Sequence, residues 1–504
     1  MTADIIHDTD PLQWIDVHAR ERPAAPFLST VVGGVVSYAE LDLITRRVVA
    51  ALRGLGVAKG DRVCVAVEKS VEAVFVYIAC LRMGAVYMPL NTAYTTAELE
   101  YFLGDARPRL LLIAPAAAHA ALREAAGRSD TLVHTLDAEG AGSFADWMQT
   151  FGPDALDVEL LGTDLAALVY TSGTTGRSKG AMITRANLAA GSRALVAAWE
   201  FRAEDVLLHV LPLFHVHGLF MALNTVLAAG ASMLFVNRFD ARETWALLPR
   251  ATVFMGVPTH YTRLLALPEF GKLPLRLFIS GSAPLLAETH REFEARTGHR
   301  ILERYGMTET QVLASNPLHG VRKPGSVGPP LPGVTMRIVP LSGEDAADAA
   351  GMIEVHGPAV FRGYWNSPEK TAADLRADGF FITGDVGRFD ADGYLFIVGR
   401  AKDLIISGGY NVYPVEVEEA IDALPGVIES AVIGVPHPDF GEGVTAVVAT
   451  KLPLEEVATI AQLKQRLANY KIPKRVLFVA ELPRNAMGKV QKAALRAQHA
   501  ELYR

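Results

Sequence analysis

The residues TSGTTGRSKG, at positions 171–180, combine several glycines and hydroxyl side chains with two cations, Arg177 and Lys179. They follow an apolar run at 165–170 that reads as a strand. Glycines let backbone N–H groups turn toward a phosphate, and hydroxyl groups add further donors. The cationic side chains can balance the phosphate charge. This segment is therefore predicted to be a phosphate-binding loop at the end of a strand.

Two well-known phosphate-loop patterns do not fit the segment. It has no adjacent Gly–Lys pair, which the pattern G-x-x-x-x-G-K-[ST] requires. It also lacks G-x-G-x-x-G at the start of a helix, so a dinucleotide-binding fold is unsupported. Taken alone, the loop could equally be a solvated turn rich in Ser, Thr and Gly. The rest of the chain has to separate these two interpretations.

Short β-branched runs alternate with helical patterns along most of the chain around this loop. Strands are predicted at 62–67, 86–89, 109–113, 251–254 and 276–279, and helices at 70–83 and 95–103. The helix at 70–83 places Val71, Val74, Tyr77, Ile78 and Leu81 on one face. The Ala-rich residues 114–142 are predicted to be helical surface with a loop. This alternation predicts an α/β fold of mostly parallel sheets covered by helices.

The character of the sequence changes near residue 400. Residues 379–399 are dense in Gly and Asp. Beyond them the pattern predicts helices at 415–424 and 454–469, and strands at 427–434, 444–449 and 475–479. These elements form a predicted α+β unit of about a hundred residues, which is an ordinary domain size. We therefore predict a large N-terminal domain at 1–400 and a small C-terminal domain at 401–504.

Composition excludes several classes of protein. Lys and Arg total 48 against 55 Asp and Glu, and the net charge of -7 argues against a dedicated nucleic-acid binder. The two cysteines, Cys64 and Cys80, are too few for a disulfide framework or a cysteine-rich metal site. The first twenty residues are acidic without an apolar segment, and no run of about 18 apolar residues follows. We expect a cytoplasmic protein without a membrane span, and the sequence leaves its oligomeric state open.

Five further motifs accompany the loop in a fixed order. They are LPLFHVHG at 211–218, YGMTE at 305–309, TGD at 383–385, GRAKDLI at 399–405 and PRNAMGK at 483–489. Together with YTSGTTGRSKG at 170–180 they resemble the signatures of the adenylate-forming (acyl-adenylate) ligases, which include acyl-CoA synthetases, adenylation domains and luciferases. The resemblance extends from VSYAELD at 36–42 to Lys492. It implies the acyl-adenylate ligase fold, with a mobile C-terminal domain.

The resemblance also implies a two-step reaction with ATP, coenzyme A and Mg²⁺. A carboxylate first attacks the α-phosphate of ATP, which gives an acyl-AMP and pyrophosphate, and a thiol then attacks the activated carbonyl. Because the first step brings two anions together, it needs cations and hydrogen-bond donors at the developing charge. Lys489 matches the lysine that bridges the carboxylate and the α-phosphate. Glu309 matches the ligand of Mg²⁺, a hard cation that prefers oxygen.

The same resemblance assigns the other site residues. Nucleotide-binding positions are Thr171, Ser172, Gly173, Thr174, Thr175, Gly176, Lys179, Ser280, Gly281, Ser282, Ala283, Glu303, Tyr305, Gly306, Met307, Thr308, Asp385 and Arg400. Thr308 would meet the α-phosphate, Tyr305 would stack on adenine, and Asp385 would accept both ribose hydroxyls. Ser407, Gly408 and Gly409 would help form the CoA channel, and Lys402 is the hinge about which the small domain rotates. His215, with Lys489 and Thr308, completes the catalytic set.

Arg304 is the residue that points to a class of acid. Many relatives have a small residue before the tyrosine of YGxTE, whereas this chain has Arg304, beside an acyl pocket that would include Ser280 and His215. A buried arginine needs an anion, and the second carboxylate of a short dicarboxylate would provide one. An ion pair with Glu303 is the alternative. VYTSGTTGRSKGAM, FISGSAPL, LERYGMTET and PRNAMGKVQK resemble the segments of malonyl-CoA synthetases, which implies malonate and, second, methylmalonate.

Other activities stay open at this stage. The enzyme could ligate CoA to another short-chain or aromatic acid, or it could load a carrier protein. An oxygenase on the same scaffold has no positive support, since fold alone does not determine function. A pure binding protein would not need Lys489, Glu309 and Asp385 to be intact. Exchange of pyrophosphate into ATP would separate the enzymes from that last class.

Overall fold

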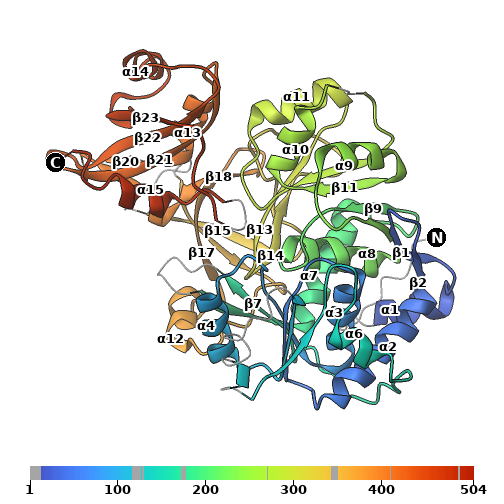
Figure 1. The fold of residues 1–504 in the computed structure, drawn as a ribbon. Coiled ribbons are helices and arrows are strands. Elements are labelled where there is room, and N and C mark those ends of the chain that lie inside the picture. The colour runs from blue at the N-terminus through green and yellow to red at the C-terminus, as the bar shows by residue number, and fades with distance from the viewer. Residues whose placement is uncertain are drawn as a thin grey trace. The chain divides into compact units, whose positions relative to one another are not determined.

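The computed structural model describes residues 13–115, 126–127, 130–171, 178–268, 271–341, 350–408, 410–485 and 489–503. The chain forms two compact units (Figure 1). Unit 1 consists of Met1–Thr335 and His356–Phe381, and unit 2 consists of Met336–Val355 and Ile382–Arg504. Each unit has its own sheets and its own hydrophobic core, and we describe them separately.

The first sheet of unit 1 carries the glycine-rich loop. Its six strands have the order β6-β5-β3-β4-β7-β8. They are β3 (Arg62–Ala66), β4 (Val86–Pro89), β5 (Leu110–Ile113), β6 (Leu132–Thr135), β7 (Leu165–Thr171) and β8 (Lys179–Thr184). Neighbouring strands run parallel except β7 and β8, which are antiparallel. The loop therefore connects two strands of a hairpin at one edge of the sheet.

The second sheet of unit 1 carries the other motifs. Its eight strands have the order β14-β13-β12-β11-β9-β10-β1-β2. They are β1 (Pro26–Thr30), β2 (Val35–Ser37), β9 (Val206–His209), β10 (Ser232–Phe235), β11 (Val253–Gly256), β12 (Leu277–Ser280), β13 (Leu302–Met307) and β14 (Gln311–Ser315). The inner pairs are parallel, whereas β1–β2 and β13–β14 are antiparallel. The parallel strands β12 and β13 thus bring SGSA and YGMTE to the same edge.

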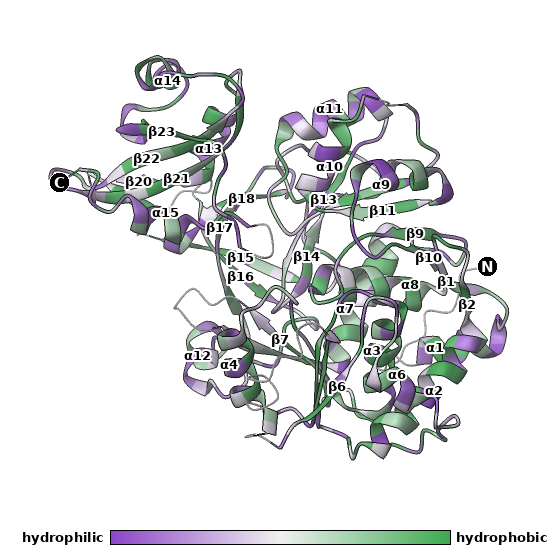
Figure 2. Ribbon diagram, viewed as in Figure 1, coloured by the Kyte–Doolittle hydropathy of each residue, from purple (hydrophilic) through white to green (hydrophobic). Residues whose placement is uncertain are grey.

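Helices cover these sheets, and several of them begin at side-chain caps. They are α1 (Gln13–Glu21), α2 (Tyr38–Gly54), α3 (Val71–Met83), α4 (Thr96–Ala106), α6 (Ser143–Met148), α7 (Arg185–Trp199), α8 (Asn224–Ala229), α9 (Ala241–Leu247), α10 (Pro258–Leu265), α11 (Ala287–Thr297) and α12 (Pro368–Asp374). Ser37 with Glu40 and Thr95 with Glu98 form capping boxes that satisfy the first N–H groups of α2 and α4. Figure 2 shows α9, α10 and α11 with both hydrophilic and hydrophobic parts, as expected for helices between a core and water.

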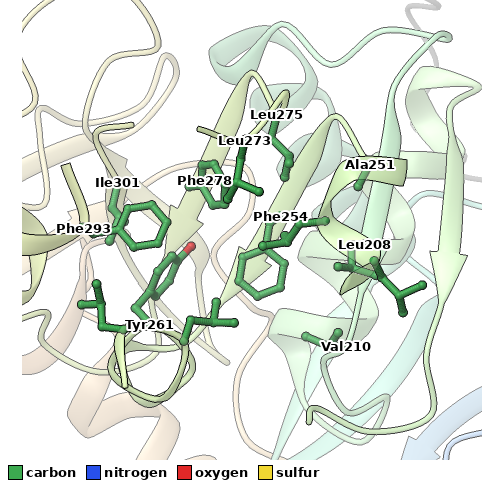
Figure 3. Close-up of a cluster of buried hydrophobic side chains, with 14 of the residues drawn as sticks. Leu208, Val210, Ala251, Phe254, Tyr261, Leu273, Leu275, Phe278, Phe293 and Ile301 are labelled. Carbon is green, nitrogen blue, oxygen red and sulfur yellow. The ribbon is translucent and has the colours of Figure 1, made fainter. Parts of the chain in front are cut away.

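An aromatic core fixes the strand that leads to SGSA. Phe254, Phe278, Tyr261 and Phe293 are buried between the second sheet and helices α10 and α11 (Figure 3). Tyr261 and Phe293 meet edge to face with ring centroids 5.3 Å apart, as do Phe278 and Phe293 at 5.0 Å. The Tyr261 hydroxyl donates a 2.7 Å hydrogen bond to the carbonyl of Ile279, next to Ser280. This core therefore holds the end of β12 rigidly.

Unit 2 contains two smaller sheets. One has the order β15-β16-β17-β18, and the other has the order β20-β19-β22-β21 with β23 beside β22. The strands are β15 (Thr335–Pro340), β16 (Gly351–His356), β17 (Phe381–Phe389), β18 (Leu395–Arg400), β19 (Ile405–Ser407), β20 (Tyr410–Val412), β21 (Val427–His437), β22 (Gly441–Thr450) and β23 (Arg475–Val479). Helices α13 (Pro414–Asp422), α14 (Glu456–Leu463) and α15 (Lys492–Gln498) accompany them. Apolar side chains of α13, α14 and the second sheet, such as Val417, Leu463 and Val432, form its core.

The predicted α/β fold is confirmed, with three differences. Helix α3 buries every residue from Ala73 to Met83 rather than one face, because it is packed on all sides. The stretch 114–142 includes strand β6, so a purely helical and loop interpretation was wrong, although residues 116–125 and 128–129 lie outside the described part. The two compact units do not divide at a single position, because Met336–Val355 belongs to unit 2 and His356–Phe381 belongs to unit 1. The domain boundary predicted at 400/401 concerns a moving domain and stays a prediction.

Arg82, at the end of α3, supports the first testable prediction. Its side chain is 1% exposed and pairs with Asp42 at 2.7 Å and Asp16 at 3.2 Å. We expect Asp42→Ala to lower the free energy of unfolding by about 3 kcal/mol, because it leaves a buried cation with one half-exposed partner. Chemical denaturation monitored by fluorescence measures this change. The matched control is Asp157→Ala, which removes a 77% exposed partner of Arg53 and should cost less than about 1 kcal/mol; equal losses in the two variants would contradict the argument.

Candidate active site

The glycine-rich loop is bounded by well-anchored strand ends. Thr171 pairs with Lys179 across β7 and β8. The predicted residues Ser172, Gly173, Thr174, Thr175 and Gly176 lie outside the described residues. The Tyr170 hydroxyl donates to Asp105, and the Tyr101 hydroxyl donates to the carbonyl of Ser178 at 2.9 Å. Helix α4 therefore fixes both ends of the loop.

Lys179 and Glu309 lie on either side of one tyrosine. The Lys179 ammonium is 5.7 Å from the centre of the Tyr364 ring, a cation–π distance. The Tyr364 hydroxyl donates to Oε1 of Glu309 at 3.2 Å. Burial, followed by the charge of Glu309, raises the pKa of Tyr364, so this hydroxyl stays protonated and keeps donating. Glu309 is buried in the turn between β13 and β14 and not at a helix N-terminus.

The Glu309 carboxylate fits a magnesium ion that is also held by phosphates. Mg²⁺ in nucleotide sites is usually bound by one or two carboxylates together with substrate phosphates. Among the described residues no group of three or more His, Cys, Asp or Glu side chains could hold a metal ion, so a site made only of protein ligands is not offered there. The Tyr364 hydroxyl orients the Glu309 carboxylate, whose role toward Mg²⁺ stays a prediction.

The SGSA and YGMTE motifs meet at the ends of adjacent strands. Ser280 is paired with Glu303 in the parallel β12–β13 register. Ser280, Gly281 and Glu303 are buried, Ser282, Tyr305, Gly306, Met307 and Thr308 are half-buried, and Ala283 is exposed. Oε1 of Glu303 accepts a 3.1 Å hydrogen bond from the backbone N–H of Leu285. Glu303 therefore stabilises the loop after β12, and the two motifs share one edge of the sheet.

Arg304 is a buried cation without a protein counter-ion. Its residue is 3% exposed. Nε and Nη2 have no hydrogen-bond partner, and the described residues offer it no ion pair. Burial lowers the pKa of Arg304 to about 9. The guanidinium lies directly against Gly281, where an added Cβ would be 2.4 Å from Cζ. The ion pair with Glu303, which was the alternative explanation, is not formed.

The FHVHG motif forms a turn that leads into a π-helix. The backbone N–H of His217 donates to Nδ1 of His215 at 3.1 Å, and His215 is half-buried. His217 is 1% exposed, and its Nδ1 is 3.2 Å from Oγ of Ser282. Burial, followed by the nearby Arg304 guanidinium, holds the pKa of His217 well below its usual range. The segment His217–Leu223 is a π-helix. This form is rare in proteins as a whole, but where it occurs it is often at a functional site.

A buried Lys69–His209 pair supports that turn, and the sequence analysis missed it. The Lys69 ammonium donates to the carbonyls of His209 at 2.8 Å and Val236 at 2.6 Å, and lies 2.9 Å from Nδ1 of His209. Nε2 of His209 donates to the carbonyl of Gly218 at 2.9 Å. Since Nε2 carries the proton, Nδ1 accepts from Lys69. Burial holds the pKa of Lys69 well below its usual range. Lys69 follows the apolar run 63–67 after Glu68, and nothing in the sequence pattern linked it to His209.

A cavity of about 270 Å³ lies beside this pair. Its lining includes Lys69, Tyr87, Phe214, Arg238, Phe239 and His260. The His260 ring stacks on Phe239 with centroids 3.9 Å apart. The cavity combines apolar walls with a few polar side chains, which is the usual make-up of a small-molecule site.

The predicted ribose acceptor and its neighbour form an ion pair within unit 2. Nε of Arg400 is 2.9 Å from Oδ1 of Asp385, and the two residues are paired across β17 and β18. The backbone N–H of Asp385 donates to Oγ1 of Thr383 at 3.1 Å. Asp385 is buried, whereas Arg400 is exposed. The TGD motif thus positions the carboxylate as a strand residue and not only as a turn.

The predicted hinge and CoA-channel residues lie at the start of the α+β part of unit 2. Lys402 is in a single 3-10 turn, Ala401–Asp403, and is exposed. Asp403 in that turn pairs with Arg496 of α15 at 3.0 Å. Ser407 is buried, Gly408 has a φ of +60° that suits glycine, and Gly409 lies outside the described residues.

Lys489 is exposed on a turn that ion pairs anchor on both sides. Its backbone N–H donates to Oδ1 of Asn485 at 3.0 Å, and its carbonyl accepts from the N–H of Asn485 at 2.9 Å. Arg484 pairs with Glu429, and Lys492 pairs with Glu418 at 2.6 Å. These contacts hold residues 484–485 and 489–492 on unit 2, and Lys489 is exposed there.

Family models describe most of this chain. The AMP-binding enzyme model matches residues 15–365, and the AMP-binding enzyme C-terminal domain matches residues 416–489. The chain belongs to the AMP-binding enzyme family. The resemblance inferred from the motifs is thereby confirmed. No helix in the described ranges is long and apolar enough to cross a membrane.

Relatives that match most of this chain differ in the acids that their names give. A malonate–CoA ligase of Arabidopsis thaliana is 38% identical over 481 residues, which cover 88% of this chain and 79% of that protein. An indoleacetate–CoA ligase of Aromatoleum aromaticum is 36% identical over 500 residues, which cover 96% of this chain and 97% of that protein. MatB from Rhodopseudomonas palustris, whose ATP-bound crystal structure is known, is 50% identical in sequence. The match has a TM-score of 0.94 and covers 97% of this chain and 100% of that chain. The acid must therefore be argued from residues of the site.

Proposed function

We propose that this enzyme ligates malonate to coenzyme A through a malonyl-AMP intermediate, giving malonyl-CoA, AMP and pyrophosphate. The observation that carries the proposal is Arg304, a buried guanidinium with two unpartnered nitrogens beside the SGSA loop. The malonate–CoA ligase of Arabidopsis thaliana and MatB are among the proteins to which the chain is similar. Methylmalonate, which has the same two carboxylates, is the proposed second substrate.

The described residues leave the charge of the Arg304 guanidinium uncompensated. An unpaired buried ion destabilises a protein by several kcal/mol unless an anion and hydrogen bonds accompany it. The second carboxylate of malonate supplies both, in charge-assisted hydrogen bonds to a planar fork. A monocarboxylic acid would instead leave the guanidinium unpaired and place an apolar group against it. The same argument disfavours indoleacetate and other aromatic acids, whose rings cannot pair with Arg304.

The remaining residue roles are proposals from the family resemblance. Lys179 and Thr308 would contact phosphate oxygens, and Lys489 would lie between the two reacting anions during adenylation. Glu309 would hold Mg²⁺, which neutralises phosphate charge when it is bound. Tyr305 and Asp385 would bind adenine and ribose. Lys402 would act as the hinge, and Ser407–Gly409 would contact CoA in the second half-reaction.

Two alternative activities and the cellular compartment of the enzyme also belong to the proposal. The enzyme could use another short-chain acid, or it could transfer the acyl group to a carrier protein instead of free CoA. A short monocarboxylic acid would leave Arg304 without a counter-ion, whereas the carrier alternative concerns the acyl acceptor and is independent of Arg304. The cytoplasm is the proposed compartment, because Cys64 and Cys80 are both free and buried thiols.

The test of the proposed function is AMP formation from ATP, Mg²⁺ and CoA with malonate, methylmalonate, acetate, butyrate and benzoate. We expect malonate to give the highest kcat/KM. Arg304→Ala should lower the value for both dicarboxylates by about ten- to a hundredfold, the loss of a charge-assisted pair. The matched control is Arg263→Ala, which removes an exposed arginine of α10. A wild-type preference for acetate or benzoate, or an equal loss of kcat/KM for every acid in Arg304→Ala, would refute the assignment of malonate as the substrate.

A further inference from the structure

Arg304 is one of three buried residues around Gly281 whose side chains each have a polar atom without a hydrogen-bond partner among the described residues. Nε2 of His217 and Oγ of Ser280 are also inaccessible and make no hydrogen bond to the described residues. All three residues belong to unit 1 and are at most 3% exposed. Buried polar atoms are nearly always hydrogen-bonded, so a group of unpartnered ones calls for an explanation. A ligand with several acceptor atoms would satisfy them together.

His217 is suited to act as a neutral donor in this group. Its low pKa keeps the imidazole uncharged near neutral pH, because burial and the Arg304 guanidinium both oppose protonation. A neutral imidazole has one donor nitrogen and one acceptor nitrogen. When the Ser282 hydroxyl donates to Nδ1, which is 3.2 Å away, the proton resides on Nε2. That unpartnered nitrogen then offers an N–H to an acceptor.

The position of the imidazole is fixed from two sides. Ser282 holds Nδ1 from a backbone with a φ of +72°, which is uncommon for a residue other than glycine. On the other side, His209 binds the carbonyl of Gly218, the residue after His217, and Lys69 holds His209 in turn. Such strained and supported geometry is typical of a residue that is preorganised for a ligand.

We propose that His217 is a specificity-determining residue that donates a hydrogen bond from Nε2 to the second carboxylate of the substrate, beside the charged contact from Arg304. This inference rests on the proposed function, since it requires a dicarboxylate. Two donors from different elements, one neutral and one charged, would fix the orientation of that carboxylate. A monocarboxylate would leave both donors unpaired, and sites that hydrogen-bond a substrate group discriminate strongly against analogues that lack it.

The experiment compares His217→Leu with His217→Gln, which keeps an N–H donor of similar reach. In His217→Leu we expect the KM for malonate to rise by about ten- to a hundredfold, as for a lost hydrogen bond to a charged group, with the KM for ATP unchanged. His217→Gln should retain most of the wild-type value. His290→Leu is the matched control, because His290 is also buried in unit 1 with one unpartnered nitrogen but lies on α11. Thermal unfolding of each variant checks that it folds.

The double variant His217→Leu with Arg304→Ala measures whether both residues bind one group. Two contacts to the same carboxylate should not be independent, so the combined loss should be smaller than the product of the single losses. The inference is overturned if His217→Leu and His217→Gln have the same malonate KM, or if His217→Leu raises the KM for ATP as much as that for malonate. Should the leucine variant not fold, His217→Asn, whose amide is too short to reach, takes its place against His217→Gln. A wild-type enzyme that prefers acetate would instead refute the proposed function.

Discussion

Replacing Lys489 with alanine should lower the rate of acyl-adenylate formation by at least about a thousandfold, while leaving the folded protein intact. The adenylation step joins a carboxylate to a phosphate that is already anionic, and a positioned cation at a phosphoryl group can contribute about 10³ or more to the rate. Lys489 is exposed on a turn whose two flanking ion pairs do not involve its own ammonium. Because Lys489 is exposed, its replacement is expected to change the stability of unit 2 much less than it changes the adenylation rate.

The two half-reactions distinguish this role from a general loss of activity. Exchange of labelled pyrophosphate into ATP with malonate reports adenylation, and release of AMP from synthetic malonyl-AMP with CoA reports thioester formation. We expect Lys489→Ala to lose the first and to keep most of the second. Lys464→Ala, which removes another exposed lysine of unit 2, should change neither. Near-normal exchange in Lys489→Ala, or an equal loss of both half-reactions, would contradict a role confined to adenylation.

The elements of the parallel sheets could be predicted because local sequence and tertiary structure agree there. Runs such as 62–66 and 86–89 are apolar and β-branched, and the helix between them starts at a capping serine, Ser70. Strand β6 was not predicted, because its residues are only partly buried and do not show the same apolar run. The one-faced pattern expected for α3 failed since a helix inside a large domain can be buried all round.

The candidate site was predictable only as far as its residues lie in contiguous motifs. SGSA could be placed at a strand end, because it follows the apolar run predicted at 276–279, whereas YGMTE and TGD were identified only by the family resemblance. The Lys69–His209 pair could not, since its members are 140 positions apart and neither carries a recognisable pattern. The π-helix after FHVHG has no composition that distinguishes it from an α-helix. For Arg304 the sequence left two explanations, and the absence of a pair with Glu303 favours the substrate carboxylate.

The second large effect is expected from Gly306→Ala, which should lower kcat/KM for every acid by at least about a hundredfold and destabilise unit 1 by about 3 kcal/mol or more. Gly306 lies at a register shift of the β13–β14 hairpin. An added Cβ there would be 1.9 Å from the backbone oxygen of Gln311. The hairpin cannot easily retreat, because Gln311 donates a 2.7 Å hydrogen bond to the carbonyl of Asn187 in α7. The strands must therefore separate, and that movement displaces Thr308 and Glu309 together.

Because the hairpin carries residues assigned to the nucleotide and not only to the acid, the loss in Gly306→Ala should appear in the KM for ATP as well as in kcat. This pattern differs from that of Arg304→Ala, in which kcat/KM should fall only for the dicarboxylates. Gly104→Ala is the matched control, since the same substitution on α4 meets no atom within 4 Å. Steady-state kinetics and chemical denaturation of the two glycine variants measure both effects. Wild-type kinetics in Gly306→Ala would show that the hairpin can open without moving the site, which would remove the basis for treating YGMTE as one rigid unit.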